Sequence, residues 1–138
     1  MKYPCQLLLG AILFAATAVP VAAESTLENI YWRATEIGGK PVDLAPEQIP
    51  HVAFHAAESR VAGFSGCNRF FAVYSQNDNE LAIKVMGGAR ATCPELGNLE
   101  VEFLAALQVT THLELADGTL TLFDSDAHSV AKFIGVIR

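Results

Sequence analysis

The sequence predicts a mainly β (α+β) fold, a small curled antiparallel sheet or open β-barrel of about eight strands with one packed α-helix. Short runs rich in β-branched and aromatic residues recur along the chain, separated by glycine and polar turns. One segment, residues 92–108, instead carries apolar residues at helical spacing. Because barrel closure removes exposed strand edges, a barrel is a stable arrangement for so many short strands.

The N-terminal residues predict a signal peptide. Lys2 gives a positive start, residues 7–19 form an apolar core, and residues 21–23 are small, as a signal peptidase requires. The alternative, a membrane anchor, is disfavoured because a spanning helix needs about 20 apolar residues. We therefore expect a signal peptide over residues 1–23 with cleavage after Ala23, and one domain over residues 24–138. The expected location is periplasmic or secreted, with no stable membrane anchor after cleavage.

The predicted strands alternate apolar and polar residues and are bounded by turn residues. They comprise residues 29–37, 51–57, 60–65, 69–75, 80–85, 112–116, 119–124 and 130–137. Asp117-Gly118 between two such runs is a strong hairpin signal. Residues 38–50 contain three prolines and form the longest irregular stretch, which we expect to cross a sheet edge or a barrel end.

The predicted helix lies within residues 92–108 and presses one face on the sheet. Thr92 and Glu95 have the spacing of a capping box, and Asn98 is an alternative cap because Gly97 weakens the first turn. Its apolar stripe consists of Leu96, Leu99, Phe103, Leu104 and Leu107. Its outer, solvated face is expected to carry Glu95, Glu100 and Glu102.

The charge of the chain excludes some partner classes. Without residues 1–23, 8 basic residues face 15 acidic ones, since only Lys2 is lost. A surface that follows nucleic-acid phosphates or docks on an anionic membrane needs a basic face, so we expect no nucleic-acid partner. The sequence also lacks a Gly-x-Ser-x-Gly elbow, a P-loop and a dinucleotide fingerprint. We expect no enzyme and no cofactor.

The histidines do not predict a metal site. His51 and His55 would share one ion on a helix, but on the predicted strand they stand about 13 Å apart and are expected to face solvent. His112 and His128 have no partner at ligand spacing.

Two cysteines remain after signal cleavage, Cys67 and Cys93. In an oxidising compartment an even pair predicts a disulfide, which we favour over a cysteine nucleophile or a metal ligand. The bridge would close a loop of about 27 residues, worth roughly 3 to 4 kcal/mol in the chain-entropy account. It would join the segment around Cys67 to the start of the helix.

The residues around Cys67 predict a tightly turned or bulged strand end. Gly63 and Gly66 allow backbone angles or close approaches that a side chain would obstruct, and Asn68 tolerates a left-handed conformation. Arg69 is placed to interact with nearby carbonyls or a carboxylate.

These residues also carry a family resemblance. The chain resembles the META-domain family, the heat-inducible HslJ-like proteins of bacterial envelopes, over about residues 27–136. The similar segments are "YWRATEIGGKPVD", "RVAGFSGCNRFFAVYS", "ELAIKVMGGARATCPE", "EFLAAL" and "LTLFD". The most specific piece is the motif corner Gly66, Cys67, Asn68, Arg69 and Phe70.

The resemblance implies a small antiparallel β fold with one helix, an exported or envelope location and no established enzymatic activity. It links the family in general terms to heat shock, antibiotic tolerance and motility or secretion. The chain departs from relatives at Ala89, where they often carry threonine. Many relatives are lipid-anchored, whereas we expect no lipid anchor here because no cysteine follows the apolar core of the predicted signal peptide.

Three functions follow as expectations. The first is a non-catalytic envelope protein, a monomer, that supports stress tolerance through contacts with an envelope protein. The second is a module that binds a lipid or small apolar ligand, and it would need a cavity of about 300 Å³ or more. An enzyme is the third and least favoured. The phenylalanines that suggest the ligand-binding module are Phe54, Phe64, Phe70, Phe71 and Phe123.

Overall fold

The computed structural model describes residues 10–16 and 26–137, which contain nine strands and one α-helix. The predicted cleavage site at Ala23 lies outside the described residues, as does most of the predicted signal peptide. The strands are β1 (Tyr31–Ile37), β2 (Lys40–Pro41), β3 (His51–His55), β4 (Arg60–Phe64), β5 (Arg69–Asn77), β6 (Glu80–Gly88), β7 (His112–Ala116), β8 (Thr119–Phe123) and β9 (Ser129–Val136). The helix α1 spans Leu99–Val109.

Eight of these strands form a closed antiparallel barrel, and β2 is an additional short strand beside β1. Neighbouring strands follow the order β1, β3, β4, β5, β6, β7, β8 and β9, and β1 pairs with β9 along its whole length. The mainly β class is confirmed, with one refinement: the barrel is closed rather than open. Closure depends on β1, whose other edge is shared by β3 at Tyr31–Arg33 and by β2 at Glu36 and Ile37.

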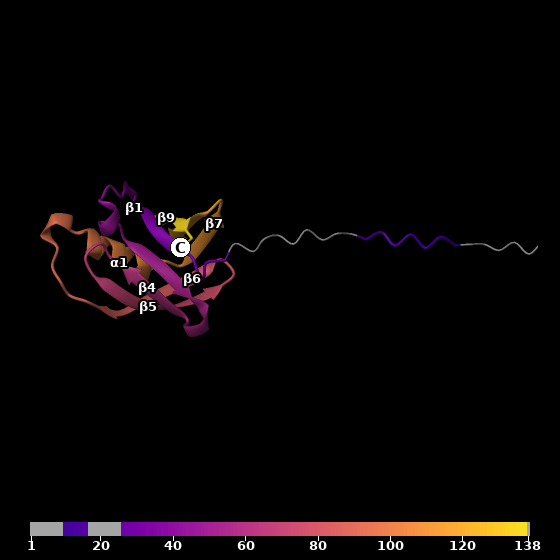
Figure 1. The fold of residues 1–138 in the computed structure, drawn as a ribbon, viewed down its shortest axis with the longest axis horizontal. Coiled ribbons are helices and arrows are strands. Elements are labelled where there is room, and N and C mark those ends of the chain that lie inside the picture. The colour runs from indigo at the N-terminus through magenta and orange to yellow at the C-terminus, as the bar shows by residue number, and fades with distance from the viewer. Residues whose placement is uncertain (1–9, 17–25, 138) are drawn as a thin grey trace, which may run out of the picture.

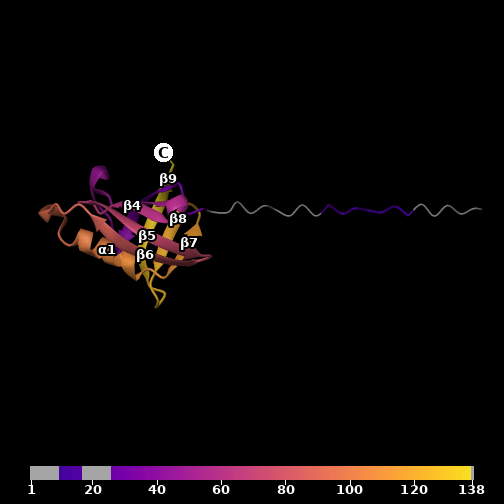
Figure 2. The ribbon, with the colours of Figure 1, turned by 90° about the horizontal axis from the view of Figure 1, so that it is seen from below.

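The pairing between β6 and β7 is the weakest part of the barrel. Only Glu80 and His112 are in register there, and two backbone hydrogen bonds flank them. Between these two strands the chain forms α1, which packs against β6 and β9. Figures 1 and 2 both show α1 near one end of the molecule and β7 towards the other.

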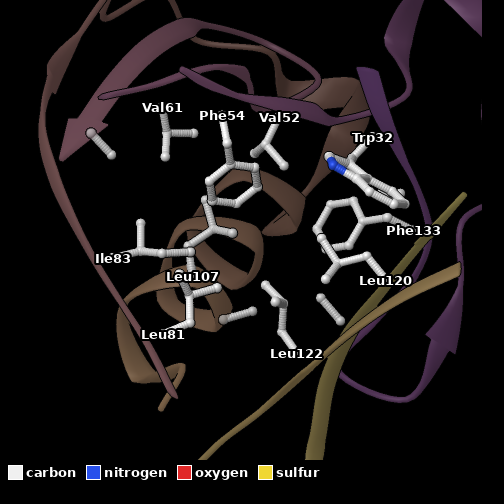
Figure 3. Packing of buried hydrophobic residues seen from close by; sticks show 14 of the residues in the cluster. Trp32, Val52, Phe54, Val61, Leu81, Ile83, Leu107, Leu120, Leu122 and Phe133 are labelled. Carbon is white, nitrogen blue, oxygen red and sulfur yellow. The ribbon is translucent and has the colours of Figure 1, made fainter. Parts of the chain in front are cut away.

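Apolar side chains fill the barrel interior. Phe103 of α1 lies between Phe70 and Phe133, with ring centroids 6.0 and 6.2 Å away. The Trp32 indole N–H donates a 2.8 Å hydrogen bond to the Leu27 carbonyl, so this buried polar atom has a partner. Figure 3 shows labelled side chains of this core, among them Trp32, Phe54 and Phe133, pointing toward one another. The largest fully buried apolar residues are Phe54, Phe103, Phe133, Leu81, Leu107, Leu120, Leu122, Val52, Val61 and Pro50.

The helix begins later than the Thr92 capping box predicts. Pro94–Leu96 forms a separate 3-10 turn, and Gly97 follows with a φ of +58° that ends it. Asn98 is the residue before α1, as the alternative prediction placed it, although its side chain makes no capping hydrogen bond. Among the described residues, no helix combines the length and apolar character needed to cross a membrane.

Candidate functional site

Cys67 and Cys93 form a disulfide, with their Cα atoms 5.8 Å apart. The predicted pairing is confirmed. It joins the β4–β5 connection to the segment that precedes α1. While this bond is intact, neither sulfur is a thiolate, so Cys67 has no nucleophile or metal ligand to offer. Cys67 therefore acts as an anchor in the folded chain.

A partly buried polar network lies beside the disulfide. The Asn68 side chain pairs with the backbone of Ala91 in both directions: its Oδ1 accepts from the Ala91 N–H and its Nδ2 donates to the Ala91 carbonyl, each at 2.9 Å. Ser65, which is fully buried, accepts a 2.9 Å hydrogen bond from the Asn68 N–H at its Oγ. The side-chain amide of Asn68 thus forms with the 89–93 segment the paired hydrogen bonds that the backbone of a neighbouring strand would form.

Glu100 completes this network from the first turn of α1. One of its carboxylate oxygens accepts from Asn68 Nδ2 at 2.9 Å and from the Ser65 hydroxyl. The prediction that Glu100 lies on the outer helix face is wrong, because the side chain is half-buried and turned toward the β4–β5 connection. Glu95 and Glu102 are exposed, as expected.

The two glycines of the corner are required by space. Gly66 has a φ of +95°, and a Cβ there would come within 3.0 Å of the Gln48 carbonyl oxygen. A Cβ at Gly63 would lie 2.3 Å from the ring of Phe70. The interpretation of these glycines as close-approach positions is therefore correct. Arg69 contributes its carbonyl, which accepts from the Ala89 N–H at 2.9 Å, while its exposed side chain borders a small hollow.

That small hollow, of about 240 Å³, has aromatic walls. The His51 ring lies 4.2 Å from Tyr31 and 5.5 Å from Phe64, measured between centroids. His51 is half-buried, so the prediction that it faces solvent is wrong, whereas His55 is exposed as predicted. The strand alternation correctly placed His51 on the face opposite the buried Val52, but it did not reveal the aromatic neighbours that cover the His51 ring.

A larger groove, of about 650 Å³, lies at the other end of the β5–β6 hairpin. Its apolar surface comes from Leu113, Leu115 and Phe123, and no lysine or arginine lines it. Its lining residues are Gln76, Asp78, Asn79, His112, Leu113, Glu114, Leu115, Phe123, Asp124, Ser125 and Ala127. Sequence reasoning missed this groove because it depends on how far β7 extends past the hairpin.

The loop after β8 brings three metal-ligating groups together. Ligand atoms of Asp124, Asp126 and His128 lie within 4.8 Å of one another, although the sequence gave His128 no partner. Asp124 Oδ1 already accepts backbone hydrogen bonds from Asp126 and His128, both at 2.9 Å. The hydrogen bond from the His128 N–H is the main reason that the pKa of the Asp124 carboxyl is lowered. The hydrogen bonds within the turn therefore explain why these three side chains lie close together.

The phenylalanines divide between core and surface. Phe54 and Phe70 are buried, and Phe64 and Phe123 are half-buried. Phe71 is 46% exposed, with the Arg60 guanidinium 5.9 Å from its ring centroid. The interior phenylalanines therefore pack against other side chains of the chain itself.

These features define a class of protein: a small closed antiparallel β-barrel with one helix packed against it, and the segment before the helix is joined to the barrel by a disulfide and a partly buried polar network. Within that class, the chain belongs to the META domain family, whose model matches residues 25–134. This match confirms the resemblance carried by the segments around Cys67.

Solved structures share the fold. The solution structure of a protein from Burkholderia xenovorans is 21% identical, with a TM-score of 0.63, covering 81% of this chain and 85% of its own. Another solution structure is 24% identical, with a TM-score of 0.58, covering 78% and 91%. The crystal structure of a DUF4847 family protein from Bacteroides vulgatus is 12% identical, with a TM-score of 0.64, covering 81% and 96%. No curated protein matches the chain.

Proposed function

We propose that the protein is a non-catalytic, exported envelope protein, periplasmic or secreted, that supports stress tolerance through contacts with another protein. The observation that carries this proposal is the division between a filled interior and a hollowed exterior. Phe54, Phe103 and Phe133 occupy the barrel interior, whereas the 650 Å³ groove opens on the outer surface. Binding that leaves the core intact therefore takes place on the outside.

The disulfide supports export. Disulfides persist in oxidising compartments outside the cytoplasm, and the Cys67–Cys93 bridge closes a span of 26 residues in a small domain. The predicted signal peptide and the exported location implied by the family resemblance support the same proposal.

The same observations count against the alternatives. A lipid held inside the barrel would have to displace fully buried side chains such as Phe133. An enzyme that used Cys67 as its nucleophile would first need the disulfide reduced. Native mass spectrometry of the protein purified from the envelope tests both: the expected mass is that of the cleaved monomer, two hydrogens below the dithiol and without a bound lipid.

The test in cells uses a chromosomal deletion complemented by two versions of the gene. We expect the deletion to reduce survival after heat or detergent stress, and the full chain to restore it. A version that starts after Ala23 is expected to fail, because it is not exported. Photo-crosslinking in the native envelope is expected to trap a protein partner. Normal survival of the deletion strain, together with no trapped partner, would overturn the proposal.

A further inference from the structure

The edge of β7 that faces the groove is largely unpaired. On one side, all five residues from His112 to Ala116 pair with β8. On the other side, β6 pairs in register only at His112, and the last contact is the Leu113 N–H hydrogen bond to the Asn79 carbonyl, at 2.9 Å. Among the described residues, no strand lies beside β7 beyond that point.

Strand geometry shows which backbone groups this leaves available. Because backbone groups of alternate residues point to the same edge, the N–H and C=O of Leu115 face the same side as the N–H of Leu113. Residues 113–116 therefore offer an edge of about 13 Å, at about 3.3 Å per residue, which accommodates an extended segment of about four residues. Such an edge is a template for strand addition.

The groove beside this edge selects the occupant by charge. Asp78, Glu114 and Asp124 provide three carboxylates, of which Asp124 is already engaged by Asp126 and His128, and no lysine or arginine lines the groove. Leu115 and Phe123 are half-buried there and offer apolar contact between these charges. A strand that alternates basic and apolar side chains would satisfy both features, since its side chains point alternately to opposite faces.

A second copy of this chain fits less well. The domain carries 15 acidic and 8 basic residues once residues 1–23 are removed, so pairing two β7 edges would bring like charges together. Glu114 on β7 would then face an acidic groove on the other copy, and like charges across paired strands are destabilising.

We propose that the groove beside β7 is a docking site for a basic, extended segment of a partner protein, which adds as a strand to the free edge of β7. The proposal rests on the proposed function for the existence of a partner, and it adds where that partner binds and what chemistry it presents.

The probe is an acetylated octapeptide of alternating lysine and valine, added to the oxidised domain at low ionic strength. We expect amide chemical-shift changes at residues 112–116 and 78–79, and slower hydrogen exchange at Leu115. Glu114→Lys is expected to weaken binding at least tenfold. Glu102→Lys, with the same charge change on the exposed helix face, is the matched control and should reduce affinity less than threefold.

Two further peptides separate strand addition from simple charge attraction. A glutamate–valine octapeptide is expected not to bind. A lysine–valine octapeptide with N-methylated backbone keeps its charge but lacks alternate N–H donors, and is expected to bind at least tenfold more weakly. Equal binding of the N-methylated peptide would overturn strand addition, and shift changes elsewhere on the surface would overturn the site. Dimers that pair through β7 would assign the edge to self-association instead.

The experiments can contradict the docking site and the proposed envelope function independently of each other. If the Glu114→Lys protein still traps its partner in the envelope and restores stress survival, the groove is not the docking site, while the proposed function stands. If the peptide binds as expected but the deletion strain shows no phenotype and no partner, the envelope role fails and the binding site stands.

Discussion

The two ends of the β5–β6 hairpin are held in opposite ways. At the start of β5, the Cys67–Cys93 disulfide and the Asn68 network fix the chain to the 89–93 segment and to α1. About 26 Å away along the nine-residue strands, β6 meets β7 through a single register pair. The cross-links therefore lie near the start of α1, whereas the strand that follows the end of α1, β7, keeps a largely unpaired edge.

The disulfide is the largest contribution to this difference. We expect Cys67→Ser to lower the free energy of unfolding by about 3 to 4 kcal/mol, because the unfolded chain regains loop entropy. For a domain of this size, that is a fall of roughly 12 to 16 °C in Tm. Calorimetry under oxidising conditions measures it. The Cys67→Ser/Cys93→Ser double variant should match the single one, and an unchanged Tm would refute the anchor role.

The Asn68 network is the next largest contribution. Asn68→Ala removes the paired hydrogen bonds to Ala91 and leaves Glu100 with fewer donors, so we expect a loss of about 2 to 3 kcal/mol. Asn77→Ala, at the exposed opposite end of β5, is the control and should change stability by no more than about 0.5 kcal/mol. Urea unfolding compares the two. Equal losses would mean that the two ends are not held differently.

Tyr74 tests how the free end of the hairpin is tied to the N-terminal segment. Its hydroxyl donates to Glu28 at 3.3 Å, and burial, with the nearby Glu28 carboxylate, raises its pKa above 10.0. A phenol with a raised folded-state pKa stabilises the fold below pH 10 and loses that contribution as pH rises through the folded value. Tyr74→Phe is expected to cost about 1 kcal/mol at pH 7.

The pH dependence checks the assignment to Tyr74. The stability difference between the wild-type protein and Tyr74→Phe should shrink as pH rises above 10. Ultraviolet titration of the phenol should give a midpoint above that of free tyrosine. A midpoint at or below 10, or a difference constant with pH, would contradict the hydrogen bond to Glu28.

The Asp124 turn is expected to have the smallest effect. The hydrogen bonds from the His128 and Asp126 N–H groups lower the pKa of this carboxyl below 3.8. Its contribution is therefore present above pH 3.8 and is lost as pH falls through the lower folded value. We expect Asp124→Asn to lower Tm slightly at pH 6 and by less as the pH falls below 3.8, and Asp126→Asn to have less effect throughout. Thermal scans that show the same small change at pH 2 would contradict this.

Local signals in the sequence predicted several elements well. The hairpin of β7 and β8 matches within one residue because Asp117 and Gly118 both have positive φ, at 52° and 76°, as such a turn requires. The cysteine count predicted the disulfide. The start of α1 was less certain because two capping signals competed, and the break at Gly97 decided between them.

Features that depend on distant segments were not visible in the sequence. Closure of the barrel needs β1 to pair with β9, which is far away in the chain. The inward direction of Glu100 depends on Ser65 and Asn68, which reach it only in the folded barrel. The free edge of β7 depends on the offset between β6 and β7, which no local pattern encodes.

Amide hydrogen exchange of the oxidised protein, followed by NMR, tests the contrast between the two ends most directly. The account predicts slow exchange at Asn68 and Ala91, whose N–H groups are bonded within the corner network. On β7 it predicts fast exchange at Leu115, next to slow exchange at Leu113, which is bonded to Asn79. Protection of the Leu115 amide comparable to that of Asn68 would contradict the free edge and the docking site built on it.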